Sequence, residues 1–206
     1  RKKLENKYNC KTFVSISEAI IKTKPNIVVI ATPTHFHLEN IKEVFNNGNP
    51  EIIFCEKPLS LNYTDSQKIL ELCESNKSKL FVNYFRTVIP SINKISNLIK
   101  SKEIKLPFKG SCTYSKGLFN SASHFINLFQ LYFGKVIEID IINKNNYDLD
   151  FEPDFELKFS DGEIIFISNK NNSIFINEFD LIMKNGKLTF RNGGNDIFWE
   201  PIIKDE

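Results

Sequence analysis

Short apolar runs alternate with amphipathic stretches over the first ninety residues of the chain. Asn26 opens the run N-I-V-V-I-A, and residues 52–55 are I-I-F-C; each predicts a strand, as does a third run at 80–83. A continuous β-branched run such as 26–31 is typical of a strand buried on both faces. Strands separated by helices in this way predict a parallel sheet with helices on its faces.

Helical periodicity predicts the elements between these strands. The stretch S-I-S-E-A-I-I-K-T predicts a short amphipathic helix near Ser17, and a second helix is expected over 35–47. A third is expected over 63–76, where Asn62 or Thr64 is the candidate N-cap.

The pattern changes after Pro90. Helices are expected at 91–101 and 121–132, the second of them rich in Phe and Leu. Asp161-Gly162 and Asn185-Gly186 are strong hairpin signals. The strands expected around them cover residues 109–115, 135–143, 154–160, 163–168, 173–183 and 187–190. The second half therefore predicts an α+β domain with a mostly antiparallel sheet.

Composition excludes several classes of protein. The net charge of +2 is too small to indicate binding to nucleic acid or to an anionic membrane. No apolar run approaches the roughly 20 residues of a membrane-spanning helix, and no secretory signal is present. The four cysteines lack metal-binding spacing, so we expect reduced thiols and a cytoplasmic location.

Two polar motifs follow predicted strands. T-P-T-H comes after the run at 26–31, and E-K-P comes after 52–55. Ligands of open parallel sheets bind beyond the carboxyl ends of the strands, so Lys57 is expected to project into a ligand crevice. Spacing alone also allows an ordinary exposed lysine in a turn.

The three histidines allow different chemistry. His124 lies near the start of a predicted helix, where it could be a general acid or base, or else a core or capping histidine. His35 and His37 form an H-x-H pair, but zinc needs further ligands and none stands at suitable spacing. We therefore expect no metal site. The chain also contains no G-x-G-x-x-G motif.

Four segments together resemble one family. N-I-V-V-I-A-T-P-T-H-F-H, F-C-E-K-P-L-S, F-V-N-Y-F-R-T-V-I-P and K-G-L-F-N-S-A-S-H-F-I-N-L are similar to the glucose–fructose oxidoreductase / inositol dehydrogenase / rhizopine-catabolism (Gfo/Idh/MocA) family over about residues 3–192. The resemblance implies a Rossmann domain, a C-terminal α/β domain with an open sheet, and NAD or NADP as cofactor.

The resemblance also implies roles for individual residues. Lys57 and His124 match the catalytic lysine and histidine of the family, and Asn120 stands where the family has an aspartate. His124 would take the hydroxyl proton while Lys57 stabilises the developing negative charge; Asn120 cannot ionise. Pro58 would commonly be cis. The implied cofactor-binding residues are Ala31, Thr32, Pro33, His37, Glu56, Lys57, Pro58, Asn83 and Arg86.

Against this family the chain is expected to be a fragment. Arg1 begins within a helical stretch and the glycine-rich βαβ start is absent. We therefore expect a truncated Rossmann-type parallel sheet over 1–88, with the boundary near 86–90. A substrate and oligomerisation domain would follow over 89–206, without a closing element after Trp199.

The expected function is hydride transfer between NAD or NADP and a sugar or nucleotide-sugar carbon. The segment K-G-L-F-N-S-A-S-H-F-I-N resembles family members found in sugar pathways of bacterial surface-polysaccharide synthesis, and this resemblance implies such a substrate. A non-catalytic dinucleotide-sensing protein and an NAD-using glycosidase remain as alternatives. The expected partners are a small sugar or nucleotide sugar and a second copy of the chain, which would bind through the C-terminal sheet; no nucleic acid or membrane is expected.

Overall fold

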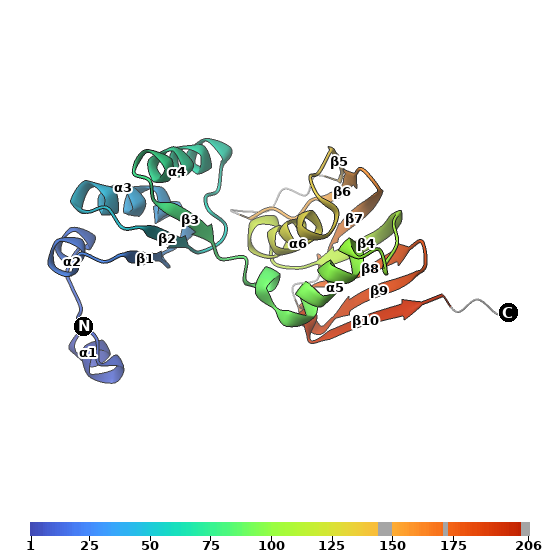
Figure 1. Cartoon of the computed structure of the whole chain (residues 1–206), viewed down its shortest axis with the longest axis horizontal. Helices are drawn as coiled ribbons and strands as arrows, with labels where there is room; N and C mark the ends of the chain where they lie inside the picture. The colour runs from blue at the N-terminus through green and yellow to red at the C-terminus, as the bar shows by residue number, and fades with distance from the viewer. Residues whose placement is uncertain (144–149, 171–172, 203–206) are drawn as a thin grey trace. The chain divides into compact units, whose positions relative to one another are not determined.

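The computed structural model describes residues 1–143, 150–170 and 173–202 of the chain. The chain divides into two compact units, residues 1–83 and residues 84–206 (Figure 1). Each unit has its own hydrophobic core, so each is described by itself.

The first unit contains a three-stranded parallel sheet in the order β1-β2-β3. This confirms the parallel sheet that the sequence predicts. The strands are β1 (Ile27–Ile30), β2 (Ile52–Cys55) and β3 (Lys79–Val82). The helices are α1 (Lys2–Tyr8), α2 (Ile16–Thr23), α3 (His37–Asn47) and α4 (Tyr63–Ser75), with a 3₁₀ turn η1 (Thr34–Phe36) before α3.

Side-chain caps fix where two of these helices begin. The Ser15 side chain accepts a hydrogen bond from the backbone N–H of Glu18, so α2 begins slightly earlier than expected. Asn62 accepts from the N–H of Asp65 at 2.8 Å and caps α4. Of the two candidate caps, the structure therefore selects Asn62.

Among the described residues, helices cover one face of the first sheet. Ile30 and Ile53 pack in one core with residues of α3 and α4. Ile27 and Val29 point to the other face, where their side chains are 57% and 60% exposed. The expectation that the strand at 26–31 is buried on both faces is therefore wrong, because the packed helices lie on the Ile30 side alone.

The second unit contains a seven-stranded sheet in the order β10-β9-β8-β4-β7-β6-β5. The β4–β7 pair is parallel and every other pair is antiparallel. This confirms the mostly antiparallel sheet. The strands are β4 (Phe108–Tyr114), β5 (Glu138–Asn143), β6 (Asp154–Phe159), β7 (Gly162–Ser168), β8 (Glu178–Met183), β9 (Gly186–Arg191) and β10 (Asp196–Pro201).

Two helices, α5 (Pro90–Lys100) and α6 (Ser123–Phe133), form a phenylalanine-rich core with this sheet. Phe129 of α6 lies 5.1 Å from the ring of Phe179, which itself stacks on Phe190 at 4.9 Å. Many of the phenylalanines of the chain therefore lie in this core. The shorter turns of the unit are η2 (Phe85–Val88), the π-helical turn η3 (Leu118–Ala122) and η4 (Asn192–Gly194).

Two sequence expectations fail near the end of the chain. The last strand expected from the sequence ends at residue 190, so the sequence analysis missed β10, which pairs with β9. The alternation in D-I-F-W-E-P could have predicted this strand. β8 begins at Glu178 rather than at 173. The preceding segment makes hydrogen bonds to Ser115 instead, for example from the Ile176 N–H at 3.0 Å.

Candidate functional site

The candidate residues of the first unit gather at the carboxyl edge of its sheet. The N–H of Glu56 donates to the Ile30 carbonyl at 2.9 Å, and the N–H of Asn83 donates to the Cys55 carbonyl at 2.8 Å. The Asn83 amide also donates to the Glu56 carboxylate at 2.7 Å. These bonds hold the ends of all three strands together. The residues that follow the strands here are Ala31, Thr32, Pro33, Glu56, Lys57, Pro58 and Asn83.

The exposure of these residues suits a binding edge. Ala31, Thr32 and Pro33 are exposed, while Lys57 and Pro58 are half-buried. The Lys57–Pro58 peptide bond is cis, as the family resemblance implies. Small side chains beyond β1 leave the backbone open to a ligand, and a lysine stands beyond the next strand.

His37 is fully buried and connects two loops of this edge. Its Nε2 lies 2.9 Å from the Thr32 carbonyl and its Nδ1 lies 3.1 Å from the Leu59 carbonyl. The Cys55 thiol is 3.4 Å from the same Nδ1. With no exposed surface, His37 holds the loops after β1 and β2 in place rather than presenting its ring to a ligand.

Replacing His37 with phenylalanine tests this role. We expect a loss of about 1–3 kcal/mol in the free energy of unfolding, because phenylalanine removes the ring nitrogens that contact the Thr32 and Leu59 carbonyls. His35→Phe is the matched control, since His35 is exposed two residues away. Denaturant titration measures both; equal effects of the two substitutions would contradict the role assigned to His37.

In the second unit, His124 lies in an aromatic environment. Its ring meets Tyr84 edge-on at 5.7 Å and Phe85 at 5.3 Å. The neighbouring Ser123 hydrogen-bonds the phenol of Tyr84, and burial raises the pKa of Tyr84. His124 is 6% exposed, on the first turn of α6. Aromatic packing therefore fixes the plane of the imidazole.

The segment before α6 is held by a strap of three residues, Asp150–Glu152. Both oxygens of the Asp150 carboxylate accept backbone hydrogen bonds, from Phe119 at 2.8 Å and from Asn120 at 2.9 Å. The Glu152 carboxylate accepts from the Gly117 N–H at 2.7 Å. The Leu118 N–H donates to the Phe151 carbonyl at 3.0 Å. Four consecutive backbone donors are thus satisfied by the strap.

Gly117 permits this arrangement. Its φ is +92°, and a Cβ there would lie 2.0 Å from the Asp150 carboxylate. The strap thereby fixes the π-helical turn that carries Asn120, whose side chain is exposed, and leads into His124. Sequence reasoning missed Asp150 because it stands thirty residues beyond Asn120 with no local motif to connect them.

Asp150→Asn tests the strap. An amide offers one acceptor where the carboxylate offers two, so one backbone N–H loses its acceptor. We expect the free energy of unfolding to fall by about 1–3 kcal/mol. Asp161→Asn is the control, because Asp161 is exposed in a hairpin turn. A loss no greater than that of the control, measured by denaturant titration, would contradict the strap.

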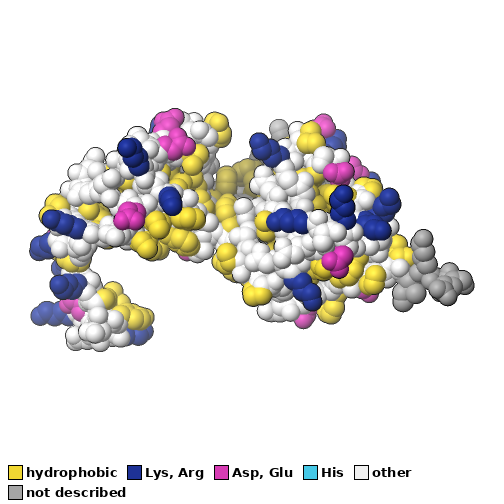
Figure 2. Space-filling model, viewed as in Figure 1, with side chains coloured by type: hydrophobic (Ala, Val, Ile, Leu, Met, Phe, Trp, Pro, Cys, Tyr) yellow, Lys and Arg dark blue, Asp and Glu magenta, His cyan; other side chains and the backbone are white. Residues whose placement is uncertain are grey.

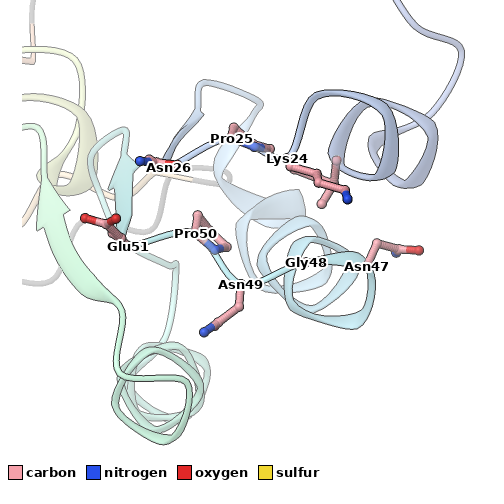
Figure 3. Close-up of a pocket in the computed structure, with 9 residues that line it drawn as sticks. Lys24, Pro25, Asn26, Asn47, Gly48, Asn49, Pro50 and Glu51 are labelled. Carbon is pink, nitrogen blue, oxygen red and sulfur yellow. The ribbon is translucent and has the colours of Figure 1, made fainter.

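A hollow of about 340 Å³ lies at the other edge of the first sheet (Figure 3). Asn26 precedes β1 and Glu51 precedes β2, so the hollow stands at the amino ends of the strands. Ligands of open α/β sheets bind at the carboxyl ends. This hollow is therefore separate from the candidate site.

Membrane-spanning helices and metal-ligand clusters are absent from the described part of the chain. No helix there is long and apolar enough to span a membrane. No group of three metal-ligating side chains gathers among those residues. All four cysteines are free thiols. On the face drawn in Figure 2, lysine and arginine side chains are scattered, without a continuous basic patch among the described residues.

Comparison with known proteins identifies the first unit. Residues 1–84 match the model of the Gfo/Idh/MocA family, described as an oxidoreductase family with an NAD-binding Rossmann fold. Over residues 1–84 the chain is similar to the Gfo/Idh/MocA oxidoreductase family. The resemblance found in the sequence motifs is thereby confirmed.

Two relatives are similar in sequence to part of the chain. Inositol 2-dehydrogenase of Corynebacterium glutamicum is 32% identical over 100 residues, which cover 48% of this chain and 29% of the relative. The rhizopine catabolism protein MocA of Rhizobium meliloti is 26% identical over 91 residues, which cover 44% of this chain and 28% of the relative. The chain thus spans less than a third of the length of either relative.

The fold of both units recurs in solved structures. The WlbA dehydrogenase of Chromobacterium violaceum, solved in complex with NADH and UDP-GlcNAcA, superposes with a TM-score of 0.81. The match covers 99% of this chain and 67% of the WlbA chain, at 14% sequence identity. This similarity shows a shared fold.

Proposed function

We propose that this protein is an NAD(P)-dependent oxidoreductase that transfers hydride between a nicotinamide cofactor and a carbon of a sugar or nucleotide-linked sugar. The observation that carries the proposal is the carboxyl edge of the first sheet. There the Glu56–Asn83 hydrogen bond and the buried His37 hold the strand ends around Lys57. Residues 1–84 match a family described as NAD-binding, which supports the choice of cofactor.

The residues at this edge fit a nicotinamide dinucleotide. Ala31, Thr32 and Pro33 would lie along the cofactor with exposed backbone, and Glu56, Lys57, Pro58 and Asn83 would surround the nicotinamide end. Arg86, which the family resemblance also implies for the cofactor, belongs to the second unit and packs there against Phe85 and Phe125. His37 acts through the loops that it joins. The bound cofactor would accept or supply the hydride. The protein residues position the substrate and move its proton.

The proposed mechanism uses two side chains on one substrate hydroxyl, as the family resemblance implies. Lys57 donates a hydrogen bond to the oxygen and stabilises its negative charge as the carbon is oxidised. His124 accepts the hydroxyl proton as general base. Asn120 orients the substrate through its amide, since a carboxamide cannot take up a proton at neutral pH.

The proposed substrate is a nucleotide-linked sugar used in bacterial surface-polysaccharide synthesis in the cytoplasm. The WlbA structure, which shares the fold, holds NADH together with a nucleotide sugar. Conversion of free sugars alone, with none of a panel of nucleotide sugars accepted, would contradict this assignment.

We also propose a homo-oligomer formed through the helix-free face of the second sheet. On that face Ile167, Ile182 and Phe198 are 45%, 58% and 53% exposed. Ion pairs such as Lys109–Glu163 lie among them. Light scattering tests the proposal: a strictly monomeric protein at high concentration would contradict it.

Nicotinamide absorbance tests the function. The full-length natural protein would be mixed with NAD, NADP or their reduced forms and with a panel of sugars and nucleotide sugars. A substrate-dependent absorbance change is expected. No change with any pair would contradict the proposal, and product formed without net change would indicate a glycosidase that uses NAD transiently.

Asn120 favours one second candidate, a non-catalytic protein that senses a dinucleotide. An amide in place of the family's aspartate fits lost proton transfer. That candidate predicts cofactor binding with no hydride transfer to any substrate, and it predicts that Lys57→Ala leaves the biological activity intact.

A further inference from the structure

Arg86 packs against two aromatic rings in the second unit. Its guanidinium carbon lies 5.4 Å from the centre of the Phe85 ring and 5.3 Å from that of Phe125. Phe125 is fully buried and Phe85 is half exposed. Contacts of this kind use the faces of a guanidinium and leave the N–H groups at its edge available as donors.

The positive charge of Arg86 is not balanced by an acidic side chain. Among the described residues no carboxylate forms an ion pair with Arg86, and its Nε is buried without an acceptor. Burial lowers the pKa of the guanidinium, and the Cys112 thiol opposes this shift to a smaller extent. Partly buried charges are normally paired, because an unpaired one costs free energy. The two ring contacts offset only part of this cost.

Phe85 connects Arg86 to the proposed catalytic histidine. The same ring that lies 5.4 Å from the Arg86 guanidinium carbon also packs 5.3 Å from the ring of His124. The unbalanced cation and the imidazole therefore border one exposed aromatic side chain. A small ligand lying on Phe85 would meet both.

We propose that Arg86 binds an anionic group of the substrate, a carboxylate or a phosphate, on the molecule whose hydroxyl gives its proton to His124. This inference rests on the proposed oxidoreductase function and narrows its substrate class to anionic sugars. A guanidinium matches both anions because its planar donors form paired hydrogen bonds with two oxygens. In the ligand-bound protein the anion supplies the countercharge that the described residues lack.

The test compares anionic and neutral sugars with the full-length natural protein. Each neutral hexose would be paired with its uronic acid and its phosphate ester, each UDP-linked hexose would be paired with the matching UDP-linked uronic acid, and kcat/KM would be measured for every member. The protein is expected to prefer one anionic member of a pair. Arg86→Gln is expected to reduce the anionic-to-neutral ratio at least about 30-fold, the effect of removing one partner of a desolvated charge pair.

Controls separate this inference from its alternatives. Arg191→Gln removes an arginine that pairs with Asp180 and Glu178, so the ratio should stay unchanged. Arg86→Lys keeps the charge and should retain part of the preference. An Arg86→Gln variant that loses anionic and neutral activity equally, or mainly raises the KM of the cofactor, would overturn the inference. A wild-type preference for neutral sugars would also overturn it, whereas no hydride transfer at all would count against the proposed function itself.

Discussion

Replacing Lys57 with methionine is expected to lower kcat by about 100- to 1,000-fold, the cost of removing one donor from a developing oxyanion. Lys57 follows β2 at the carboxyl edge, where Glu56 is bound by Asn83 on the next strand. Methionine keeps the length and the apolar stem but has no N–H to donate. The loss should therefore fall on kcat more than on substrate KM, because the donor matters most when the oxygen carries charge.

Lys79→Met is the matched control for this prediction. Lys79 begins β3, so it lies at the opposite end of the same sheet and is exposed. Its replacement should leave kcat within about twofold of wild type, as expected for surface substitutions. Steady-state kinetics on both variants measure the two kcat values and so test the prediction. Full activity of Lys57→Met would contradict the role of Lys57.

His124→Asn is expected to reduce kcat by about 100- to 10,000-fold, the usual range for a positioned general base. Tyr84 and Phe85 pack edge-on against the His124 ring. His124 lies on the first turn of α6, directly after the segment that the strap of Asp150–Glu152 holds. Asparagine retains a polar group of similar reach and cannot accept a proton at neutral pH. Cofactor affinity should change little, since the imidazole is assigned to the substrate hydroxyl.

A fold control accompanies the His124 measurement because the residue is buried. Thermal unfolding would show whether the variant remains folded at the assay temperature, and His35→Asn serves as the exposed comparison. A folded His124→Asn enzyme with wild-type kcat would remove His124 from the mechanism. Loss of activity that exceeds the loss of folded protein is the result that the chemical role predicts.

The sequence predicts the carboxyl edge well because the geometry of parallel strands determines it. Motifs that follow adjacent parallel strands must meet at one edge, so T-P-T-H and E-K-P could be placed together before any contact was known. The burial of His37 could not be predicted in this way. Its two carbonyl partners lie five and twenty-two residues away, and nothing in H-x-H indicates them.

In the second unit, the sequence predicts the strands but not the contacts between distant residues. Its antiparallel pattern follows from local alternation and hairpin signals, which the sequence contains. The strap at Asp150–Glu152 depends on contacts between residues thirty or more positions apart. The exposure of Ile27 and Val29 is likewise a tertiary property, because it depends on which face the helices cover. Local sequence patterns cannot predict the strap or the exposure of these two side chains.

The central claim is that this protein binds a nicotinamide dinucleotide for hydride transfer. Calorimetric titration of the full-length natural protein with NAD, NADP, NADH and NADPH tests it most directly. The account predicts saturable binding of at least one of these nucleotides at one site per chain, and weaker binding by a Glu56→Ala variant, since Glu56 fixes the cofactor edge through Asn83. Absence of binding by all four nucleotides would contradict the account.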